Sequence, residues 1–244
     1  KLNWTEVRQF NLMFKTAMGA MADQTSDAYL RPETAQAIFI NFKNVYSTSR
    51  VKIPFGIAQI GKAFRNEITP KQYLFRTREF EQMELEWFCK DENRKEFFEF
   101  WLKARHKFYQ DIGLKDENYR FDAHKPEDLS HYSSATTDVE YQFPFGWKEL
   151  EGIADRGNFD LSQHTKHSGK DLAVFDEETK KSYIPSVIEC SVGVDRLFLA
   201  LICDAYAEEE IDGETRVFLK LNPAIAPITA AIIPLSKKLS EPAK

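Results

Sequence analysis

The chain lacks several features that would assign it to common classes of protein. Its 244 residues contain no run of about 18 consecutive apolar residues, so no membrane-spanning helix is expected. The three cysteines, Cys89, Cys190 and Cys203, are widely spaced and form no C-x-x-C pair. This argues against a zinc site or a disulfide framework and favours a reducing cytosol, with an organelle matrix as the alternative.

The chain also lacks an excess of positive charge, and its terminal residues match no targeting pattern. The formal net charge is −5, so bulk electrostatics do not indicate a nucleic-acid binder, and any such contact would depend on local basic patches. The first residues show no signal-peptide pattern, and neither end resembles a natural terminus, which predicts a fragment. His164 and His167 have a spacing compatible with a metal, but no third ligand is evident, so a solvated helix face is expected.

A hydrophobic content of 43% with 14% aromatic residues indicates a globular chain that can bury a large core. The apolar spacing predicts helices at 33–46, with Thr34 as a possible cap, and at 92–111, where Asp91 or Asn93 could begin the helix and Gly113 end it. Two further helices are predicted at 160–167 and 195–207. The side chains expected to face inward from the second helix are Phe97, Phe100, Trp101, Ala104 and Phe108.

The remaining segments predict strands joined by tight turns. These are a strand at 51–67, a turn at 69–72, a hairpin at 134–154 with its turn at 144–146, and a strand at 182–192. Hairpin connections favour antiparallel pairing. The sequence therefore predicts an α+β fold with a mainly antiparallel sheet flanked by helices, and argues against a doubly wound parallel sheet.

Residues 64–88 are the most informative stretch, because the second half alternates between two faces. One face combines cations, an aromatic ring and polar or acidic groups: Arg76, Arg78, Phe80, Gln82, Glu84 and Glu86. At about 3.3 Å per residue, Arg78 and Glu84 would lie roughly 20 Å apart. This span suits an elongated ligand with an anionic part, a flat ring and an amine, a description that fits ATP together with an amino acid.

The same stretch resembles motif 2 of the class II aminoacyl-tRNA synthetases, which reads Phe-Arg-x-Glu, a variable loop, then Arg-x-x-x-Phe. The matching residues are Phe64, Arg65, Glu67, Arg76 and Phe80. Residues 29–36, 79–84, 147–157 and 189–196 are similar to corresponding blocks of the single-chain, homodimeric glycyl-tRNA synthetases. Together the blocks cover nearly the whole chain in order, which is far more specific than an isolated Arg-x-Glu. The resemblance implies the class II catalytic fold.

The resemblance also implies an ATP site. Arg65 would bridge the α-phosphate and the amino-acid carboxylate, and Arg196 would meet the γ-phosphate and the adenine face, which makes these two the expected catalytic residues. Phe80 would stack on adenine, and Glu149 would hold Mg²⁺ as well as contact ATP. The other ATP-binding residues expected from family positions are Asn66, Glu67, Phe75, Arg76, Arg78, Leu150, Gly193 and Asp195. Without the motifs, each arginine could instead be a surface or salt-bridge residue.

Glycine has no side chain to grip, so its selection must use the charged amine and the exclusion of anything larger. The positions that surround glycine's ammonium group in the family are matched by Glu33, Glu84, Glu189 and Ser191, and Arg156 matches the arginine that takes the carboxylate. Phe80 and Gln82 complete the expected glycine-binding set. The alternative for these glutamates is a set of surface ion pairs. Cys190 stands where the family commonly has proline, and Ala37 where it has glycine.

Two domains are expected: residues 1–216 as the catalytic domain, without an evident motif 1, and residues 217–244 as a linker and the truncated start of an anticodon-binding domain. The latter rests on residues 226–235, which are similar to the first strand of that domain. The implied reaction is ATP-dependent activation of glycine and transfer to tRNA(Gly), by a cytoplasmic homodimer without membrane contact. Two alternatives stay open: a non-catalytic, synthetase-like accessory module that binds nucleic acid, and a class II synthetase for another small amino acid such as alanine or serine.

Overall fold

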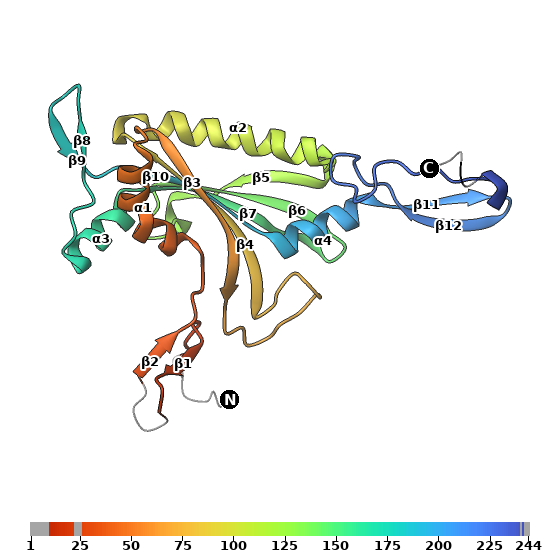
Figure 1. Ribbon diagram of the computed structural model, residues 1–244, viewed down its shortest axis with the longest axis horizontal. Helices are drawn as coiled ribbons and strands as arrows, with labels where there is room; N and C mark the ends of the chain where they lie inside the picture. Colours follow the sequence, from red (N-terminus) through yellow and green to blue (C-terminus); the bar gives the residue numbers. More distant parts are fainter. Residues whose placement is uncertain (1–9, 22–25, 240, 242–244) are drawn as a thin grey trace, which may run out of the picture.

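The computed structural model describes residues 10–21, 26–239 and 241. Its centre is a six-stranded sheet in which every neighbouring pair is antiparallel (Figure 1). The strands lie in the order β3 (Phe55–Phe64), β4 (Glu79–Cys89), β10 (Ser186–Gly193), β7 (Gly146–Gly157), β6 (Ala135–Phe143) and β5 (Tyr119–Ala123). The predicted α+β fold with an antiparallel sheet is therefore confirmed.

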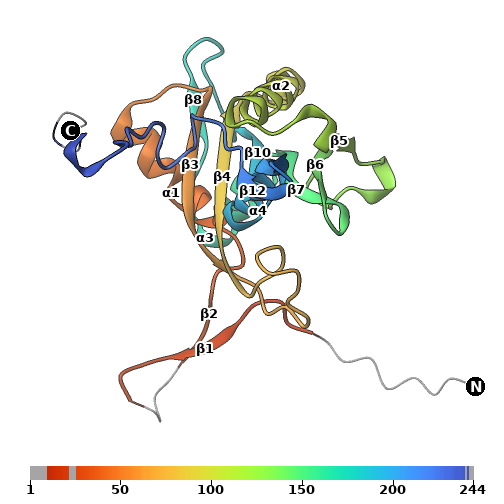
Figure 2. The same ribbon diagram turned by 90° about the vertical axis from the view of Figure 1, so that its right-hand side faces the viewer.

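In the described residues, four helices accompany the sheet: α1 (Ala35–Ser49), α2 (Arg94–Ile112), α3 (Phe159–Ser168) and α4 (Val194–Ala205). The sheet lies between α2 on one face and α1 on the other (Figure 2). Short 3₁₀ turns occur at Asp91–Asn93, Asp116–Asn118, Pro126–Asp128 and Lys237–Leu239. No helix in the described part of the chain is long and apolar enough to cross a membrane.

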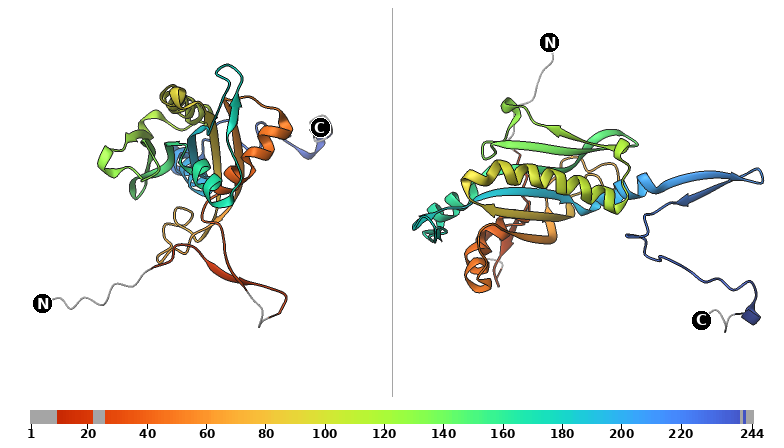
Figure 3. Two further views of the ribbon diagram at one scale, coloured as in Figure 1. Left: turned by 90° about the vertical axis from the view of Figure 1, so that its left-hand side faces the viewer. Right: turned by 90° about the horizontal axis from the view of Figure 1, so that it is seen from above.

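Within the part of the chain that the structure describes, three two-stranded sheets stand apart from the central sheet. They are formed by β1 (Lys15–Met18) with β2 (Ser26–Tyr29), β8 (Val174–Asp176) with β9 (Lys181–Tyr183), and β11 (Tyr206–Ile211) with β12 (Glu214–Leu219). The β1–β2 and β11–β12 hairpins project from different sides of the molecule (Figures 1 and 3). The sequence analysis predicts none of these hairpins, nor β5.

Period-2 alternation gives the sheet two chemically different faces. Toward α2, the strands present apolar side chains such as Leu85, Ile153 and Ile188, which belong to the main core. The opposite face carries polar and charged groups along the middle of β4, β10 and β7. At one end of this second face, α1 packs Phe39 and Phe42 against Phe88 in a second core. The predicted helix around 33–46 is thus confirmed.

Thr34 does not cap α1 as predicted. Its dihedral angles are already helical (φ −94°, ψ −15°), and its side chain makes no capping hydrogen bond. Instead the fully buried hydroxyl donates to Oε2 of Glu84 on β4. A cap would use the hydroxyl oxygen as the acceptor of a backbone N–H, whereas here the O–H donates to a buried carboxyl group and thereby directs the side chain toward β4. A local pattern cannot reveal an acceptor 50 residues away in the sequence.

The inward face of α2 differs in part from the prediction. Phe98 and Tyr109 are its buried residues, whereas Phe100 is 52% exposed. The helix is turned so that Arg105 Nε lies 2.7 Å from Glu151 Oε1, and Tyr109 donates its hydroxyl to Glu151 Oε2 at 2.5 Å. The fully buried carboxylate of β7 thus orients α2, which a pattern of apolar residues alone cannot show. Neither Asp91 nor Asn93 makes a side-chain cap, while Gly113 ends the helix with φ of 93° as predicted.

The turn before β4 lies further along the chain than predicted. A bridge between Lys71 and Arg76 closes a turn at 72–75, in which Gln72 and Tyr73 have φ of 57° and 52°. As a result, β4 begins at Glu79, and Arg76 and Arg78 precede the strand instead of lying on it. The hairpin of β6 and β7, the end of α3 at Gly169, and β10 agree with the predictions within a few residues.

The expected first strand of an anticodon-binding domain at 226–235 is not formed. Its apolar side chains are exposed, including Ile232 at 79% and Leu235 at 97%. A strand needs neighbours for its backbone groups and its apolar face, and none pairs with this segment in the described residues. Strand β12 spans the expected boundary at 216/217, so the division into two domains stays a prediction.

Candidate functional site

A cavity of about 330 Å³ opens on the sheet face opposite α2. It is built on the middle of β4, β10 and β7, with further walls from the loops before α1 and β4 and from the start of α4. Most of the predicted site residues line it: Glu33, Arg65, Glu67, Phe75, Arg76, Phe80, Gln82, Glu84, Glu149, Leu150, Arg156, Glu189, Ser191, Gly193, Asp195 and Arg196. Sequence segments more than 100 residues apart thus converge as the motifs predict.

Asn66 and Arg78 are the two predicted residues that do not line the cavity. The side-chain amide of Asn66 donates to the carbonyl of Asn11 at 3.3 Å. Arg78 donates through Nε to the carbonyl of Glu67 at 3.0 Å, and its own carbonyl accepts the amide of Arg65 at 2.9 Å. Both residues therefore brace the loop that carries Arg65 from outside the cavity.

One end of the cavity is cationic. It is lined by Arg65, Arg76 and Arg196, and no carboxylate of the described residues lies within ion-pair distance of Arg65. Arg65 is fixed instead by its Nε, which donates to the carbonyl of Pro32 at 3.1 Å, and its guanidinium carbon lies 5.4 Å from the centre of the Phe80 ring. An unpaired guanidinium beside an aromatic ring can bind an oxyanion and leave the ring for a flat partner.

Arg196 is the most enclosed of these three cations. Its Nε donates to the carbonyl of Phe75 at 3.0 Å, its Nη1 donates to the carbonyl of Glu149 at 3.0 Å, and the guanidinium lies 4.4 Å from the centre of the Phe75 ring. Burial lowers the pKa of Arg196, with Arg65 and Arg76 adding to this effect and Glu149 opposing it. Backbone carbonyls and aromatic rings hold Arg65 and Arg196, whereas Arg76 Nη1 lies 3.8 Å from Glu67 Oε2. Because Arg65 and Arg76 repel Arg196, an anion would stabilise this end of the cavity.

The opposite end of the cavity is acidic. Glu84 is 3% exposed and accepts three side-chain hydrogen bonds: from Gln82 Nε2 at 2.9 Å, from Ser191 Oγ at 2.9 Å, and from Thr34. Burial raises its pKa above the usual range, and the nearby charge of Glu33 adds to this, while the hydrogen bonds from Thr34 and Ser191 oppose it. Surrounded by donors, the carboxylate keeps a fixed position and direction.

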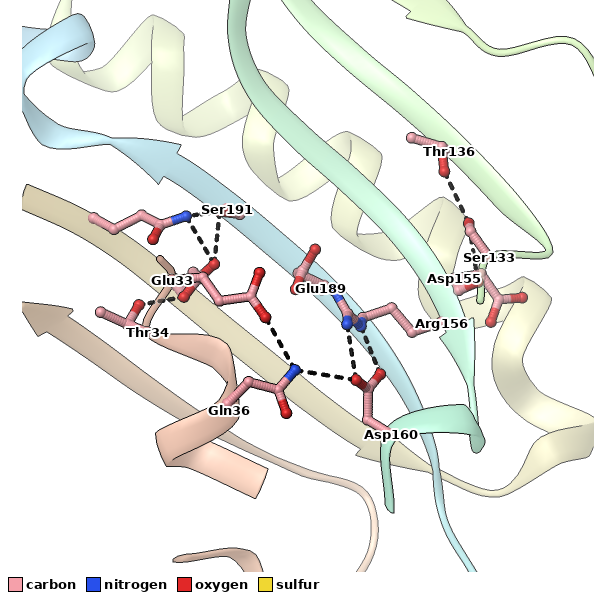
Figure 4. Close-up of polar contacts among 12 residues, drawn as sticks. Glu33, Thr34, Gln36, Ser133, Thr136, Asp155, Arg156, Asp160, Glu189 and Ser191 are labelled. Atoms are coloured by element: carbon pink, nitrogen blue, oxygen red, sulfur yellow. Dashed lines mark hydrogen bonds and ion pairs between the residues drawn. The ribbon is translucent and has the colours of Figure 1, made fainter. Parts of the chain in front are cut away.

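Arg156 ties β7 to α3 and β10 within the acidic end (Figure 4). Its Nε and Nη2 donate to the two carboxylate oxygens of Asp160 at 2.7 and 2.8 Å, and its Nη1 donates to Glu189 Oε2 at 2.8 Å. The guanidinium is 5% exposed and lies 4.3 Å from the centre of the Tyr132 ring. It thereby fixes the position of Glu189, and Asp160 is a partner that the sequence analysis does not identify.

Glu33 joins the same network from the loop before α1. Its Oε1 accepts a hydrogen bond from Gln36 Nε2 at 2.9 Å, and the same nitrogen lies 3.4 Å from Asp160 Oδ1 (Figure 4). The amide oxygen of Gln36 is 2.7 Å from His164 Nε2, so this histidine orients the glutamine. The described residues contain no cluster of His, Cys, Asp or Glu that could hold a metal ion by itself.

The sequence analysis misses one wall of the cavity. It is lined by His124, Ser130, Tyr132, Thr136 and Asp138, which lie in β6 and in the segment between β5 and β6. His124 Nε2 is 2.9 Å from Asp138 Oδ2, and this contact raises the pKa of the histidine. Alternating polar residues in 134–142 are a usable signal for this wall, because every second residue of a half-buried strand points to one face.

Glu149 and Asp195 line the cationic end of the cavity. Glu149 Oε1 is 3.8 Å from Arg196 Nη1, and its side chain is 57% exposed. Asp195 accepts the backbone amide of Glu81 at 2.8 Å, which joins the start of α4 to β4. Mg²⁺ keeps several waters and is commonly bound by one or two carboxylates together with substrate phosphates. The exposed Glu149 fits such a role, whereas a metal cage made entirely by the protein does not fit these residues.

The cavity thus combines a polycationic end and a small, rigid acidic end, joined by Phe80 and Gln82. A ligand with several anionic groups and a ligand with a positive charge could lie next to each other in it. All three cysteines are free, and Cys89 and Cys190 are buried.

Comparisons with known proteins agree with this geometry. The family model described as tRNA synthetase class II core domain (G, H, P, S and T) matches residues 14–206. The chain is 62% identical over 241 residues to the glycine–tRNA ligase of Caldanaerobacter subterraneus subsp. tengcongensis, covering 99% of the chain and 52% of that relative.

Two further curated relatives have the same printed name. The chain is 59% identical over 244 residues to the glycine–tRNA ligase of Clostridium kluyveri, covering 100% of the chain and 53% of the relative. It is 55% identical over 243 residues to that of Staphylococcus haemolyticus, covering 99% and 52%. The chain spans about half the length of the curated relatives it matches.

Proposed function

Because the chain belongs to the family of class II tRNA synthetase core domains, we propose that it forms the catalytic core of a glycine–tRNA ligase. In this proposal the carboxylate of glycine attacks the α-phosphorus of ATP, and pyrophosphate leaves with the electron pair of the broken P–O bond. The glycyl group then passes to a ribose hydroxyl of the terminal adenosine of tRNA(Gly), and AMP leaves. The observation that carries the proposal is that one cavity has a cluster of arginines at one end and buried carboxylates at the other.

The cationic end is proposed to bind the triphosphate. Arg65 would contact the α-phosphate and the attacking carboxylate, Arg76 and Arg196 would neutralise the β- and γ-phosphates, and Phe80 would stack on adenine. Glu67, Phe75, Leu150, Gly193 and Asp195 would shape this end. Glu149 would hold Mg²⁺ against the phosphates, where the ion supplies further charge neutralisation. No protein nucleophile or general base is required, since positioning and charge neutralisation accomplish the transfer.

The acidic end is proposed to select glycine. Glu33, Glu84 and Glu189 with Ser191 would hold the ammonium group and leave no room for a β-carbon. Arg156 is the expected partner of the glycine carboxylate. Since Asp160 and Glu189 engage three of its five N–H groups, the carboxylate would be met by the remaining N–H groups on Nη1 and Nη2.

The decisive experiment is ATP–pyrophosphate exchange with glycine, alanine and serine in parallel. The proposal predicts exchange that depends on glycine and is at least about 100-fold weaker with alanine, since one buried methyl group would meet fixed carboxylates. Exchange with alanine or serine instead would indicate a sister synthetase. No exchange with any of the three, in a protein that binds nucleic acid, would indicate a non-catalytic accessory module.

Replacing Glu84 by glutamine should raise the KM for glycine about tenfold, equivalent to about 1.4 kcal/mol, and leave the KM for ATP within about twofold. The amide would present an NH₂ group to Thr34 or Ser191 and would remove one negative charge from the ammonium site. Steady-state pyrophosphate exchange at varied glycine and ATP measures both constants. An unchanged KM for glycine would rule out the proposed role of Glu84.

Assembly and location follow from the same proposal. We predict that the full-length protein is a glycyl-tRNA synthetase of the single-chain, homodimeric type. A cytoplasmic location stays a prediction, with an organelle matrix as the alternative. Analytical ultracentrifugation of the full-length protein tests the dimer.

A further inference from the structure

Glu86 is a fully buried carboxyl group that the proposed reaction does not use. It is 0% exposed, and neither of its oxygens has a hydrogen-bond donor among the residues that the structure describes. It lies on the same face of β4 as Glu84, two residues further along the strand, but it does not line the cavity. A carboxylate in such a place would be an ionised group without water, donor or cation of its own.

The residue directly opposite Glu86 on the neighbouring strand is Glu189 of β10. On the other side, β3 places Ile57 opposite Glu86, and α1 supplies apolar side chains to this region. The charged groups that act on Glu86 are Glu189, Arg156 of β7 and Glu84 of its own strand. The guanidinium of Arg156 forms its ion pairs with Asp160 and Glu189, so its charge only partly offsets the effect of burial on Glu86.

Two carboxyl groups that face each other can form a hydrogen bond when one of them carries a proton. Burial, together with the charge of Glu189, raises the pKa of Glu86 well above its usual range. Burial raises the pKa of Glu189 to about 7, and a hydrogen bond from Glu86 would oppose this rise while raising the pKa of Glu86 itself. A proton on Glu86 would account for one of its two unpartnered oxygens, because that oxygen would then donate instead of accept.

We propose that Glu86, behind the cavity wall, carries a proton and donates it in a hydrogen bond to Glu189, which holds this cavity-lining carboxylate in place. Glu86 is thus a positioning residue for the acidic end, and this role in glycine selection rests on the proposed function. Glu189 is held from two sides, by Arg156 and by the neutral acid. Ionised Glu86 would instead repel Glu189 and add a buried charge that has no ion-pair partner of its own among the described residues.

The protonation state can be tested without any activity measurement. The unfolded chain releases the proton of this side chain near pH 4.3, whereas folded Glu86 retains it to higher pH. Stability contributed by the bound proton is therefore fully present below about pH 4.3 and is lost as the pH rises toward the folded pKa. Glu86→Gln keeps a donor of similar shape and does not titrate, so its advantage in stability over the wild type should grow with pH.

Thermal unfolding of the full-length wild type and of Glu86→Gln, at about pH 5, 6 and 7, provides the measurement. We expect the difference between the two unfolding midpoints, variant minus wild type, to increase at each step. If the difference in midpoint stays constant across this range, Glu86 has the same protonation state in the folded and the unfolded wild type. This result would overturn the proposal.

The positioning role is tested by a matched pair of variants in pyrophosphate exchange. Glu86→Met has similar length but no donor, so the KM for glycine should rise at least about tenfold while the KM for ATP stays within about twofold. Glu86→Gln should restore the KM for glycine to within about threefold of the wild type. Equal KM values for the two variants would exclude the hydrogen bond as the cause.

The unfolding and exchange experiments distinguish a failure of this proposal from a failure of the proposed function. If the wild type shows no glycine-dependent exchange, the proposed function fails, while the dependence of the midpoint difference on pH still decides the protonation of Glu86. If Glu86→Met does not fold, the comparison of Glu86→Gln with the wild type still tests the proton by itself.

Discussion

Replacing Arg65 by alanine is expected to lower the rate of glycyl-adenylate formation by at least about 100-fold, since a charge-stabilising donor would be lost from the reacting centre. The side chain lines the cavity and is fixed by the carbonyl of Pro32, and the described residues offer it no ion pair. Its positive charge is therefore available for the α-phosphate and the attacking carboxylate. The loss should appear mainly in kcat, because these charges concentrate in the transition state.

Single-turnover formation of the adenylate measures this effect directly. Arg65→Lys keeps the charge but loses the planar fork and should fall between the wild type and the alanine variant. Arg216→Ala is a suitable control, since Arg216 is an exposed arginine of the β11–β12 hairpin that pairs with Glu209. If the rate of adenylate formation falls by less than about tenfold in Arg65→Ala, Arg65 does not stabilise the transition state as proposed.

Replacing Arg156 by methionine is expected to destabilise the fold by about 3–5 kcal/mol, the usual cost of removing one partner from a buried charge network. The change would leave the carboxylates of Asp160 and Glu189 buried without a cation, and both face Arg156 at 2.7–2.8 Å. Glycine activation should fall as well, because Glu189 would lose its fixed position. Equilibrium urea unfolding gives the change in stability.

A combined variant tests the reason for this loss. Adding Asp160→Asn and Glu189→Gln to Arg156→Met removes the unpaired charges and should recover part of the lost stability, although not the activity. Arg120→Met is the matched surface control; Arg120 is half-exposed, pairs with Glu140, and should change stability by less than about 1 kcal/mol. A stable Arg156→Met variant would mean that the two carboxylates take up protons readily and that Arg156 is not required for the fold.

The sequence predicts the residues that line the cavity better than the contacts that hold them. The alternation along β4 correctly assigns Phe80, Gln82 and Glu84 to one face, since a strand has a fixed period of two. The ordered motifs bring Arg65, Arg156 and Arg196 together, and all three line the cavity. Their roles toward ATP and glycine stay predictions.

The failures share a physical cause, which is a partner distant in the sequence. Thr34 has the residue type and position of a cap, yet it donates to Glu84, which only the packing of the loop against β4 brings near. Phe100 fits the apolar spacing of α2, yet the buried carboxylate of Glu151 turns Arg105 and Tyr109 inward instead. Local patterns record the preferences of neighbours, and a long-range ion pair can outweigh them.

The order of the strands has a consequence for how ligands are recognised. Glu84, Glu189 and Arg156 stand on β4, β10 and β7, each of which is hydrogen-bonded along both edges. Arg65 and Arg76, by contrast, stand on the loop between β3 and β4, outside the sheet. Interior strands open only when much of the domain opens, whereas peripheral loops rearrange at little energetic expense. Under the proposed function, the amino acid would therefore be selected by a rigid site on interior strands, and the nucleotide would be bound partly by a loop that can adjust its position.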